Sequence, residues 1–339
     1  MKPRRVWIAG TAAMLCVVAG SLRPLGGGTV LSVRFGGTVW IPIHASDPWL
    51  PKPIAIALSP RAPVPEPGAL RWRTLAAGFE AGDLSVIAGK TPVDRILLAR
   101  IDPAQFRFAV RNAPRGDKEL DDWMAERCPA LVVNGSYYGR DGLPATPVLS
   151  DGRPLGPQTY SANQGAFVSS AEATGLQDLL NQDWHALFKG ADAAMVSYPL
   201  LLAQDGTSRA AGGSGWLANR SFLGQDREGR ILIGTSEGAY FTLDRLAAFL
   251  KTAPLDLKLA LNLDGGPVAC QGISLGGFER RQCGKWEIQV KDGHVKLIPT
   301  WQLLPMHFGT PAMPMALLVY PRSEKAARDA CASRARHFL

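Results

Sequence analysis

The feature that most restricts the fold of this chain is an apolar run, residues 257–263, that stops at Asp264-Gly265-Gly266. Such a run is typical of a buried strand. Glycine lacks a Cβ, so a Gly-Gly pair admits unusual backbone angles and leaves the preceding carboxylate open to a ligand. Because rigid strands often present functional groups at their ends, this junction predicts the edge of a site. An ordinary Asp-Gly turn is the alternative.

A second junction of the same kind lies upstream. The apolar residues 130–133 run directly into Asn134-Gly135-Ser136-Tyr137-Tyr138, after a segment with a helical pattern. Two strand ends that each deliver a polar side chain and a glycine predict one shared pocket.

The remaining periodicity indicates many strands and few helices. Strands are predicted at residues 93–100, 105–110, 131–133, 230–235, 257–263, 286–290, 294–298 and 316–320. The first two are predicted to pair through an Asp-Pro turn. Helices are predicted at 118–127, at 176–188 and after Thr242, which can cap one. Strand-rich runs without strict alternation predict an α+β fold, with a mixed, largely antiparallel sheet core, a few packed helices and one catalytic-type domain.

The ends differ from this middle part. Residues 1–24 combine a basic start with a short apolar body, which is typical of an export signal or an N-terminal membrane anchor. Residues 25–70 are rich in proline and glycine and are predicted to form an extended linker. The folded domain is expected over 71–321, with a basic tail at 322–339. We therefore expect an exported protein, periplasmic or extracellular, either released or tethered by its N-terminal segment.

The cysteines agree with an oxidising compartment. Beyond the first segment the chain has Cys128, Cys270, Cys283 and Cys331. Cys270 and Cys283 bracket a glycine-rich loop just past Asp264, so they are the disulfide candidate, with a pair of buried thiols as the alternative. No spacing resembles a zinc cluster, and neither a metal site nor another cofactor is predicted. Ca²⁺ is the one ion that the carboxylates would suit.

Charge narrows the choice of partners. The formal net charge is +8 and the isoelectric point is near 9.4. This favours acidic partners, either a phosphorylated glycan or an anionic membrane surface. No nucleic-acid-binding motif is present, so nucleic acid is not expected. The absence of a Walker loop, HExxH and GxSxG argues against several common enzyme classes.

Five short elements together resemble a known family. They are Asn134 to Tyr138, Ser150-Asp151-Gly152, Pro199 to Gly206, Arg220 to Gly224 and Leu263 to Gly266. In this order and spacing, over roughly residues 71–320, the chain resembles the phosphodiester glycosidase family. One position departs from the family pattern, because Val268 stands where the family usually has a serine.

The resemblance implies hydrolysis of a sugar-1-phosphodiester, such as a phosphorylated glycan or a nucleotide-sugar-like substrate, in cell-envelope or exopolysaccharide metabolism. The alternative is a non-catalytic module that binds phosphoglycan or assists envelope assembly. It is favoured by Val268, which stands where the family usually has a serine.

The same resemblance implies roles for individual residues. Arg220 would clamp the phosphate with help from Ser221, and Asp264 would face the anomeric carbon. Asn134 would bind sugar hydroxyls or orient Asp264. Glu237 is the candidate second carboxylate because it stands at another strand end, with an exposed turn residue as the alternative. A tyrosine, Tyr137 or Tyr138, would stack on the sugar. The substrate-binding set is Gly135, Ser136, Tyr138, Ser221, Gly265 and Gly266, whereas Asp151 and Asp205 are expected to be turn residues.

Overall fold

The computed structural model describes residues 29–34, 38–43, 48, 52–59, 62–113, 115, 117–126, 128–139, 141–159, 165–210, 216–284, 286–291, 294–299 and 312–323. Within these ranges no helix has the length and apolarity needed to cross a membrane.

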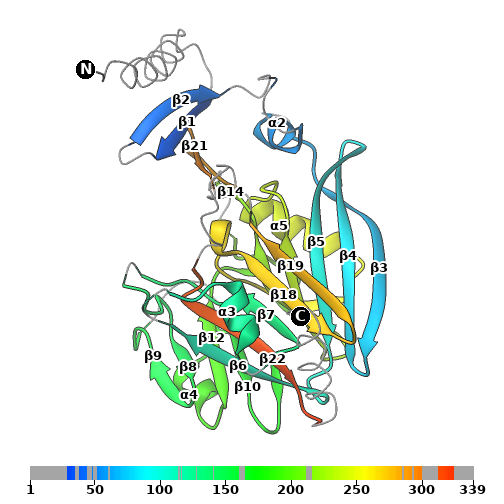
Figure 1. Cartoon of the computed structure of the whole chain (residues 1–339), viewed down its shortest axis with the longest axis vertical. Helices are drawn as coiled ribbons and strands as arrows, with labels where there is room; N and C mark the ends of the chain where they lie inside the picture. The colour runs from blue at the N-terminus through cyan, green and yellow to red at the C-terminus, as the bar shows by residue number, and fades with distance from the viewer. Residues whose placement is uncertain are drawn as a thin grey trace, which may run out of the picture.

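A seven-stranded sheet carries most of the candidate site (Figure 1). In spatial order its strands are β13 (Leu200–Leu202), β17 (Leu257–Asn262), β15 (Ser221–Asp226), β16 (Ile231–Ser236), β5 (Thr91–Ile101), β4 (Phe79–Ala88) and β3 (Glu66–Ala76). The apolar run that ends at Asp264 is therefore an inner strand, β17, with neighbours on both sides.

Two five-stranded sheets pack against the first one. The first has the order β19 (Phe278–Cys283), β18 (Cys270–Leu275), β7 (Leu131–Asn134), β22 (Met315–Pro321) and β6 (Phe106–Asn112). The second has the order β11 (Thr174–Asp178), β10 (Gly165–Ser169), β12 (Ala193–Ser197), β8 (Val148–Ser150) and β9 (Arg153–Leu155). The main core lies between these sheets and includes Leu97, Val133, Phe167, Leu261 and Leu317.

Two smaller groups of strands complete the sheets. They are the hairpin of β1 (Thr29–Arg34) and β2 (Thr38–Ile43), and the three strands β14 (Trp216–Ala218), β20 (Trp286–Lys291) and β21 (His294–Pro299). Every strand pairing within the described part of the chain is antiparallel. The predicted α+β class is confirmed, and so are the predicted strands at 286–290 and 294–298, which pair with each other.

The helices are short and cover outer sheet faces. They are α2 (Lys52–Leu58), α3 (Leu120–Ala125), α4 (Trp184–Phe188), α5 (Leu243–Thr252) and the 3₁₀ turn η1 (Gly266–Val268). As predicted, Thr242 caps α5, because its side chain accepts a hydrogen bond from the backbone N–H of Arg245. Apolar residues of α5, among them Leu246 and Phe249, pack with Phe222 on the outer face of the seven-stranded sheet.

The proline-rich region 25–70 is more structured than predicted. It holds β1, β2, α2 and the first residues of β3, and Ile54 and Ala57 of α2 are buried. Arg245 of α5 donates hydrogen bonds of 3.1 Å to the carbonyl oxygen of Ala57. Proline is compatible with this arrangement, because Pro53 lies in the first turn of α2 and β3 is an edge strand. Residues 52–58 and 66–70 are therefore not an extended linker, whereas the domain boundaries stay predictions.

Two other secondary-structure predictions are wrong. Residues 176–188 do not form one helix, because Leu176 lies in β11 and only Trp184–Phe188 is helical. The apolar spacing of this segment fits a helix, but pairing of β11 with β10 overrides it. The predicted pair 93–100 and 105–110 also fails. Both segments are strands, yet β5 pairs with β4 and β16 while β6 pairs with β22 in another sheet.

Candidate active site

The two strand ends singled out in the sequence meet in the structure. The backbone N–H of Asp264 donates to the carbonyl oxygen of Gly135 at 3.1 Å. The Asn134 amide nitrogen donates to the carbonyl oxygen of Asp264 at 2.8 Å, and its side-chain oxygen accepts from the N–H of Cys270. The buried side chain of Asn134 thus positions the backbone around Asp264, which is one of its two predicted roles.

Arg220 reaches this point from the residue before β15, the strand next to β17. Its side chain is only 6% exposed. Its Nε donates to the carbonyl oxygen of Phe241 at 3.2 Å, and Nη2 donates to that of Trp216 at 2.5 Å. These bonds hold the planar guanidinium in one orientation while it keeps its positive charge.

Gly265 explains how an arginine fits beside Asp264. A Cβ on Gly265 would lie 2.9 Å from the carbonyl oxygen of Asn219 and 3.3 Å from Nη1 of Arg220. A larger residue would therefore push against the guanidinium. Gly266 contributes differently, because its φ of 68° starts the η1 turn and its N–H donates to the same Asn219 oxygen at 2.9 Å.

Tyr137 is the tyrosine that lies in this cluster. Its hydroxyl accepts a hydrogen bond of 2.7 Å from the amide of Asn262, and its ring stacks on Tyr198 with centroids 4.3 Å apart. Burial raises the pKa of Tyr137 above its ordinary value, the negative charge of Asp264 raises it further, and Arg220 opposes both. The phenol therefore stays protonated and lies within electrostatic reach of both charged residues.

The structure assigns other tasks to several residues predicted to bind substrate. The Ser221 hydroxyl is fully buried and shares a hydrogen bond with Thr235. The Ser136 hydroxyl is buried and accepts from Thr146 at 3.1 Å. The backbone of Tyr138 bridges to Pro144. The two serine hydroxyls thus hold strands and loops together, and their substrate contacts stay predictions.

The side chain of Glu237 is engaged by an arginine of β5. Its carboxylate pairs with Arg95, the Nη2 to Oε2 distance being 2.8 Å. Its carbonyl oxygen, in contrast, accepts from the Asn219 amide at 2.6 Å. Glu237 is therefore tied to the site through its backbone, and a role as second carboxylate stays a prediction.

The predicted disulfide between Cys270 and Cys283 is confirmed. The two cysteines face each other across β18 and β19, directly after the η1 turn. Cys128 is disulfide-bonded as well. Since the N–H of Cys270 also bonds Asn134, the bridge fixes the strand that follows Asp264. Val268, the departure from the family pattern, is half-buried in the η1 turn.

The turn predictions for two acidic residues are confirmed. Asp151 and Gly152 form the tight turn between β8 and β9, both with positive φ. Asp205 accepts hydrogen bonds from the N–H and the hydroxyl of Thr207. Among the described residues, no three His, Cys, Asp or Glu side chains come together as a metal site. A Ca²⁺ site stays without a donor cluster to place it.

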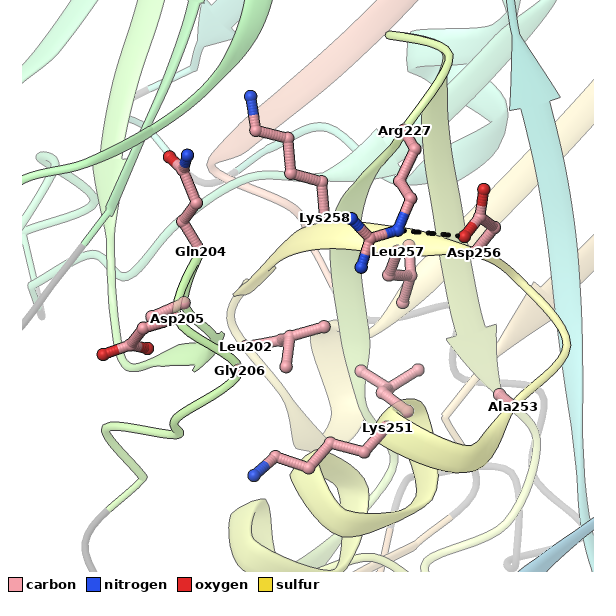
Figure 2. A pocket seen from close by; sticks show the side chains of 12 residues that line it. Leu202, Gln204, Asp205, Gly206, Arg227, Lys251, Ala253, Asp256, Leu257 and Lys258 are labelled. Atoms are coloured by element: carbon pink, nitrogen blue, oxygen red, sulfur yellow. Dashed lines mark ion pairs between the residues drawn. The ribbon is translucent and has the colours of Figure 1, made fainter.

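A separate cavity of about 770 Å³ lies at the other end of β17, where the strand starts (Figure 2). Arg227, Lys251 and Lys258 surround it, and Arg227 pairs with Asp256 at 3.2 Å. None of the residues predicted from the sequence to bind substrate lines this cavity. The candidate active site is therefore the Asp264 end of the sheet.

The part of the chain that holds the site is similar to a known family. Residues 128–269 match the family model of phosphodiester glycosidases. The matched segment contains both strand ends, Arg220 and Asp264, so the resemblance seen in the motifs is confirmed there. No curated protein matches the chain.

Three solved structures are similar to this chain, and the first of them shows the same fold. The zebrafish N-acetylglucosamine-1-phosphodiester α-N-acetylglucosaminidase catalytic domain, auto-inhibited by its pro-peptide, is 17% identical with a TM-score of 0.50, covering 78% of this chain and 86% of that domain. A hypothetical protein from Synechocystis is 14% identical with a TM-score of 0.46, covering 87% and 68% of the two chains. A Burkholderia pseudomallei protein described as exported is 12% identical with a TM-score of 0.41, covering 93% and 89%. The last two scores are too low to support a structural argument.

Sequence reasoning missed two residues of this cluster. Asn262 and Asn219 use side-chain amides to tie neighbouring loops together. The alternation of side chains along a strand could have indicated Asn262. Asn262 lies two positions before Asp264, so both face the same side if the strand continues.

Proposed function

We propose that the chain hydrolyses a sugar-1-phosphodiester, releasing the sugar and a phosphomonoester. The observation that supports this most is the electrostatic cluster of Tyr137, Asp264 and Arg220 inside the segment that matches phosphodiester glycosidases. A fixed cation beside a carboxylate and a protonated phenol suits a substrate with an anionic leaving group next to a sugar carbon.

The proposed chemistry divides between these groups. Arg220 binds phosphate oxygens and stabilises the negative charge that the leaving phosphate gains when the bond from the anomeric carbon to oxygen breaks. Asp264 faces the anomeric carbon as nucleophile, as base for water or as electrostatic partner of the transition state. Water finally supplies the hydroxyl that joins the sugar, and its remaining proton leaves to a base or to solvent. A phosphate group leaves as a stable anion, so a strong general acid is not required.

The natural substrate class we propose is a phosphorylated glycan or a nucleotide-sugar-like molecule of the cell envelope or of an exopolysaccharide. The positive net charge of the chain supports an anionic substrate. The basic and apolar start of the sequence and the Cys270–Cys283 bridge support export to an oxidising compartment.

The test is release of free sugar from N-acetylglucosamine-1-phosphodiesters, including UDP-N-acetylglucosamine, by the full chain. Asp264→Asn keeps the shape of the side chain and removes its charge, so we expect turnover to fall by roughly three orders of magnitude. The variant's circular dichroism and melting curve serve as the folding control.

A non-catalytic module is the second candidate, and Val268 in place of the family's usual serine is the observation that favours it. Such a protein would bind the phosphodiester without releasing sugar, and Asp264→Asn would keep most of that affinity. Release by the wild-type chain that disappears in Asp264→Asn would exclude the binding module, whereas binding without release would refute the hydrolase.

A further inference from the structure

One loop forms the surroundings of Arg220. We call residues 236–241 the frame loop. The segment begins at the last residue of β16, and residues at both of its ends form hydrogen bonds with Arg220. The backbone N–H of Arg220 donates to the Ser236 hydroxyl at 2.9 Å, and the N–H of Ser236 donates to the Arg220 carbonyl at 2.8 Å. With the bond from Arg220 Nε to Phe241, the loop contacts both the backbone and the guanidinium. A shift of the frame loop would therefore move Arg220.

Asp94 holds this loop from β5. Its Oδ1 accepts hydrogen bonds from the backbone N–H groups of Glu237 at 3.1 Å and Gly238 at 2.7 Å, and from that of Arg95 at 2.7 Å. Gly238 packs closely against this group, since a Cβ there would lie 3.2 Å from the Asp94 carboxylate. The N–H of Glu237 also donates to the carbonyl oxygen of Arg95 at 2.9 Å, so the Asp94 carboxyl group adds to the backbone pairing that holds the start of the loop against β5.

The other oxygen of Asp94 has no such contact. Oδ2 is buried and lacks a hydrogen-bond partner among the residues that the structure describes. The nearby charges are occupied elsewhere, because Arg95 pairs with Glu237 and with Asp83, and Asp83 pairs with Arg280. The backbone N–H of Tyr240 also lowers the pKa of the carboxyl group, but it makes no hydrogen bond to Oδ2. An ionised Asp94 would therefore bury a charged oxygen without a hydrogen bond or a counter-ion, which is unfavourable.

We propose that Asp94 is a positioning residue that keeps the frame loop closed around Arg220 in its neutral form and loosens the loop when it ionises. The consequence for substrate rests on the proposed function, because it requires Arg220 to bind a phosphodiester. The site would then bind its substrate best in mildly acidic surroundings.

Ionisation of Asp94 shifts the equilibrium between the closed and the open loop toward the open form. Burial raises the pKa of Asp94 to about 6, although the N–H groups of Gly238, Arg95, Tyr240 and Glu237 oppose it. An exposed carboxyl in an open loop would titrate near its ordinary value of 3.8. The closed loop therefore binds the proton more tightly than the open one, so raising the pH through 6 favours opening. Between pH 5 and 7.5 this linkage changes the ratio of closed to open loop about tenfold.

Hydrogen exchange of the backbone amides of Arg220, Glu237 and Gly238 tests the loop without any substrate. After correction for intrinsic exchange, we expect wild-type protection of these amides to fall about tenfold from pH 5 to 7.5. Asp94→Asn keeps the Oδ1 acceptor and cannot ionise, so its protection should stay at the acid level at both pH values. Asp83→Asn removes a nearby carboxylate that does not contact the loop, and should show the wild-type fall.

Substrate binding supplies the second readout. UDP-N-acetylglucosamine does not titrate between pH 5 and 7.5, so its KM reports the protein. We expect the wild-type KM to rise by up to about tenfold over this range with a smaller change in kcat. At pH 7.5, Asp94→Asn should show the wild-type KM of pH 5.

The outcomes separate this inference from the proposed function. Equal falls of protection in wild type and Asp94→Asn, or no fall in wild type, would overturn the role of Asp94. If the amide protection changes with pH as expected but the KM does not change with it, the proposed effect of the loop on substrate binding by Arg220 would be overturned. If the wild type releases no sugar at any pH, the proposed function fails, while the exchange experiment still decides whether Asp94 controls the loop.

Discussion

At the scale of single residues, short sequence motifs predict the two charged residues of the site, but they do not predict all of the residues that hold them in place. Asp264 and Arg220 each stand beside a strand in a short pattern that the sequence displays. Asn219 and Asn262 act through side-chain amides bonded to backbone carbonyls of other loops, and such hydrogen bonds leave no local pattern. Ser221 directly follows Arg220, and because successive strand residues face opposite sides, the strand period does not place both side chains on one face.

Tyr137→Phe is the residue-scale prediction. The change removes a buried hydroxyl that accepts a hydrogen bond from Asn262, so we expect a loss of stability of about 1 kcal/mol in urea unfolding. If the protonated phenol donates to a substrate oxygen or to Asp264, turnover should fall roughly a hundredfold. Its raised pKa also predicts that no alkaline limb of the pH profile below pH 10 belongs to this group.

Tyr138→Phe is the matched control for this prediction, because the two tyrosines are neighbours and differ in their surroundings. We expect Tyr138→Phe to keep wild-type turnover. If it loses turnover and Tyr137→Phe does not, the sequence-based choice of Tyr138 as the substrate residue would be correct.

At the scale of elements, local signals worked where they agreed with packing. Thr242 and the apolar face after it predict α5, and the continuous apolar run 316–320 predicts β22. The pairing of β5 with β16 rather than β6 joins residues about 130 positions apart, and no local pattern carries that information. The same holds for β11, where a helical spacing is overridden by an edge position beside β10.

The β18–β19 hairpin provides the element-scale prediction. Its disulfide joins Cys270 and Cys283, which are 13 residues apart. By loop-closure entropy, replacing both with serine should lower the free energy of unfolding by about 3 kcal/mol. The double variant is preferable to a reducing agent because Cys128 is also disulfide-bonded.

The same variant bears on the site. The Cys270 N–H bonds Asn134, which in turn holds Asp264, so we expect amides near Asp264 to exchange faster in the double variant. Thermal melts and amide exchange of the two proteins would measure both effects. An unchanged melting temperature would mean that the antiparallel pairing alone holds this hairpin.

At the scale of the whole molecule, the site is built where one inner strand of the seven-stranded sheet meets β7 of the facing sheet. The antiparallel class is foreseeable from many short apolar runs with few helices. The packing of three sheets around one core is not foreseeable from the sequence, because it depends on which strands pair with each other across long stretches of the chain. Nearly all residues that position Asp264 and Arg220 come from different strands, so the site requires the complete sheet arrangement.

The pH dependence of global unfolding tests whether the complete fold sets the environment of Asp94. The unfolded chain releases the Asp94 proton near pH 3.8, whereas the folded protein keeps it until about pH 6. Between these values the folded state binds more protons, so the Asp94 contribution to stability is largest below pH 4 and is lost as the pH rises through 6. A shift of this size corresponds to roughly 3 kcal/mol. Other carboxylates titrate in the same range, so the informative quantity is the difference in unfolding free energy between wild type and Asp94→Asn. We expect urea unfolding to show the variant gaining on the wild type from pH 4 to 6 and running parallel to it above pH 7, whereas parallel curves throughout would mean that Asp94 has an ordinary pKa and that the folded sheet does not penalise its charge.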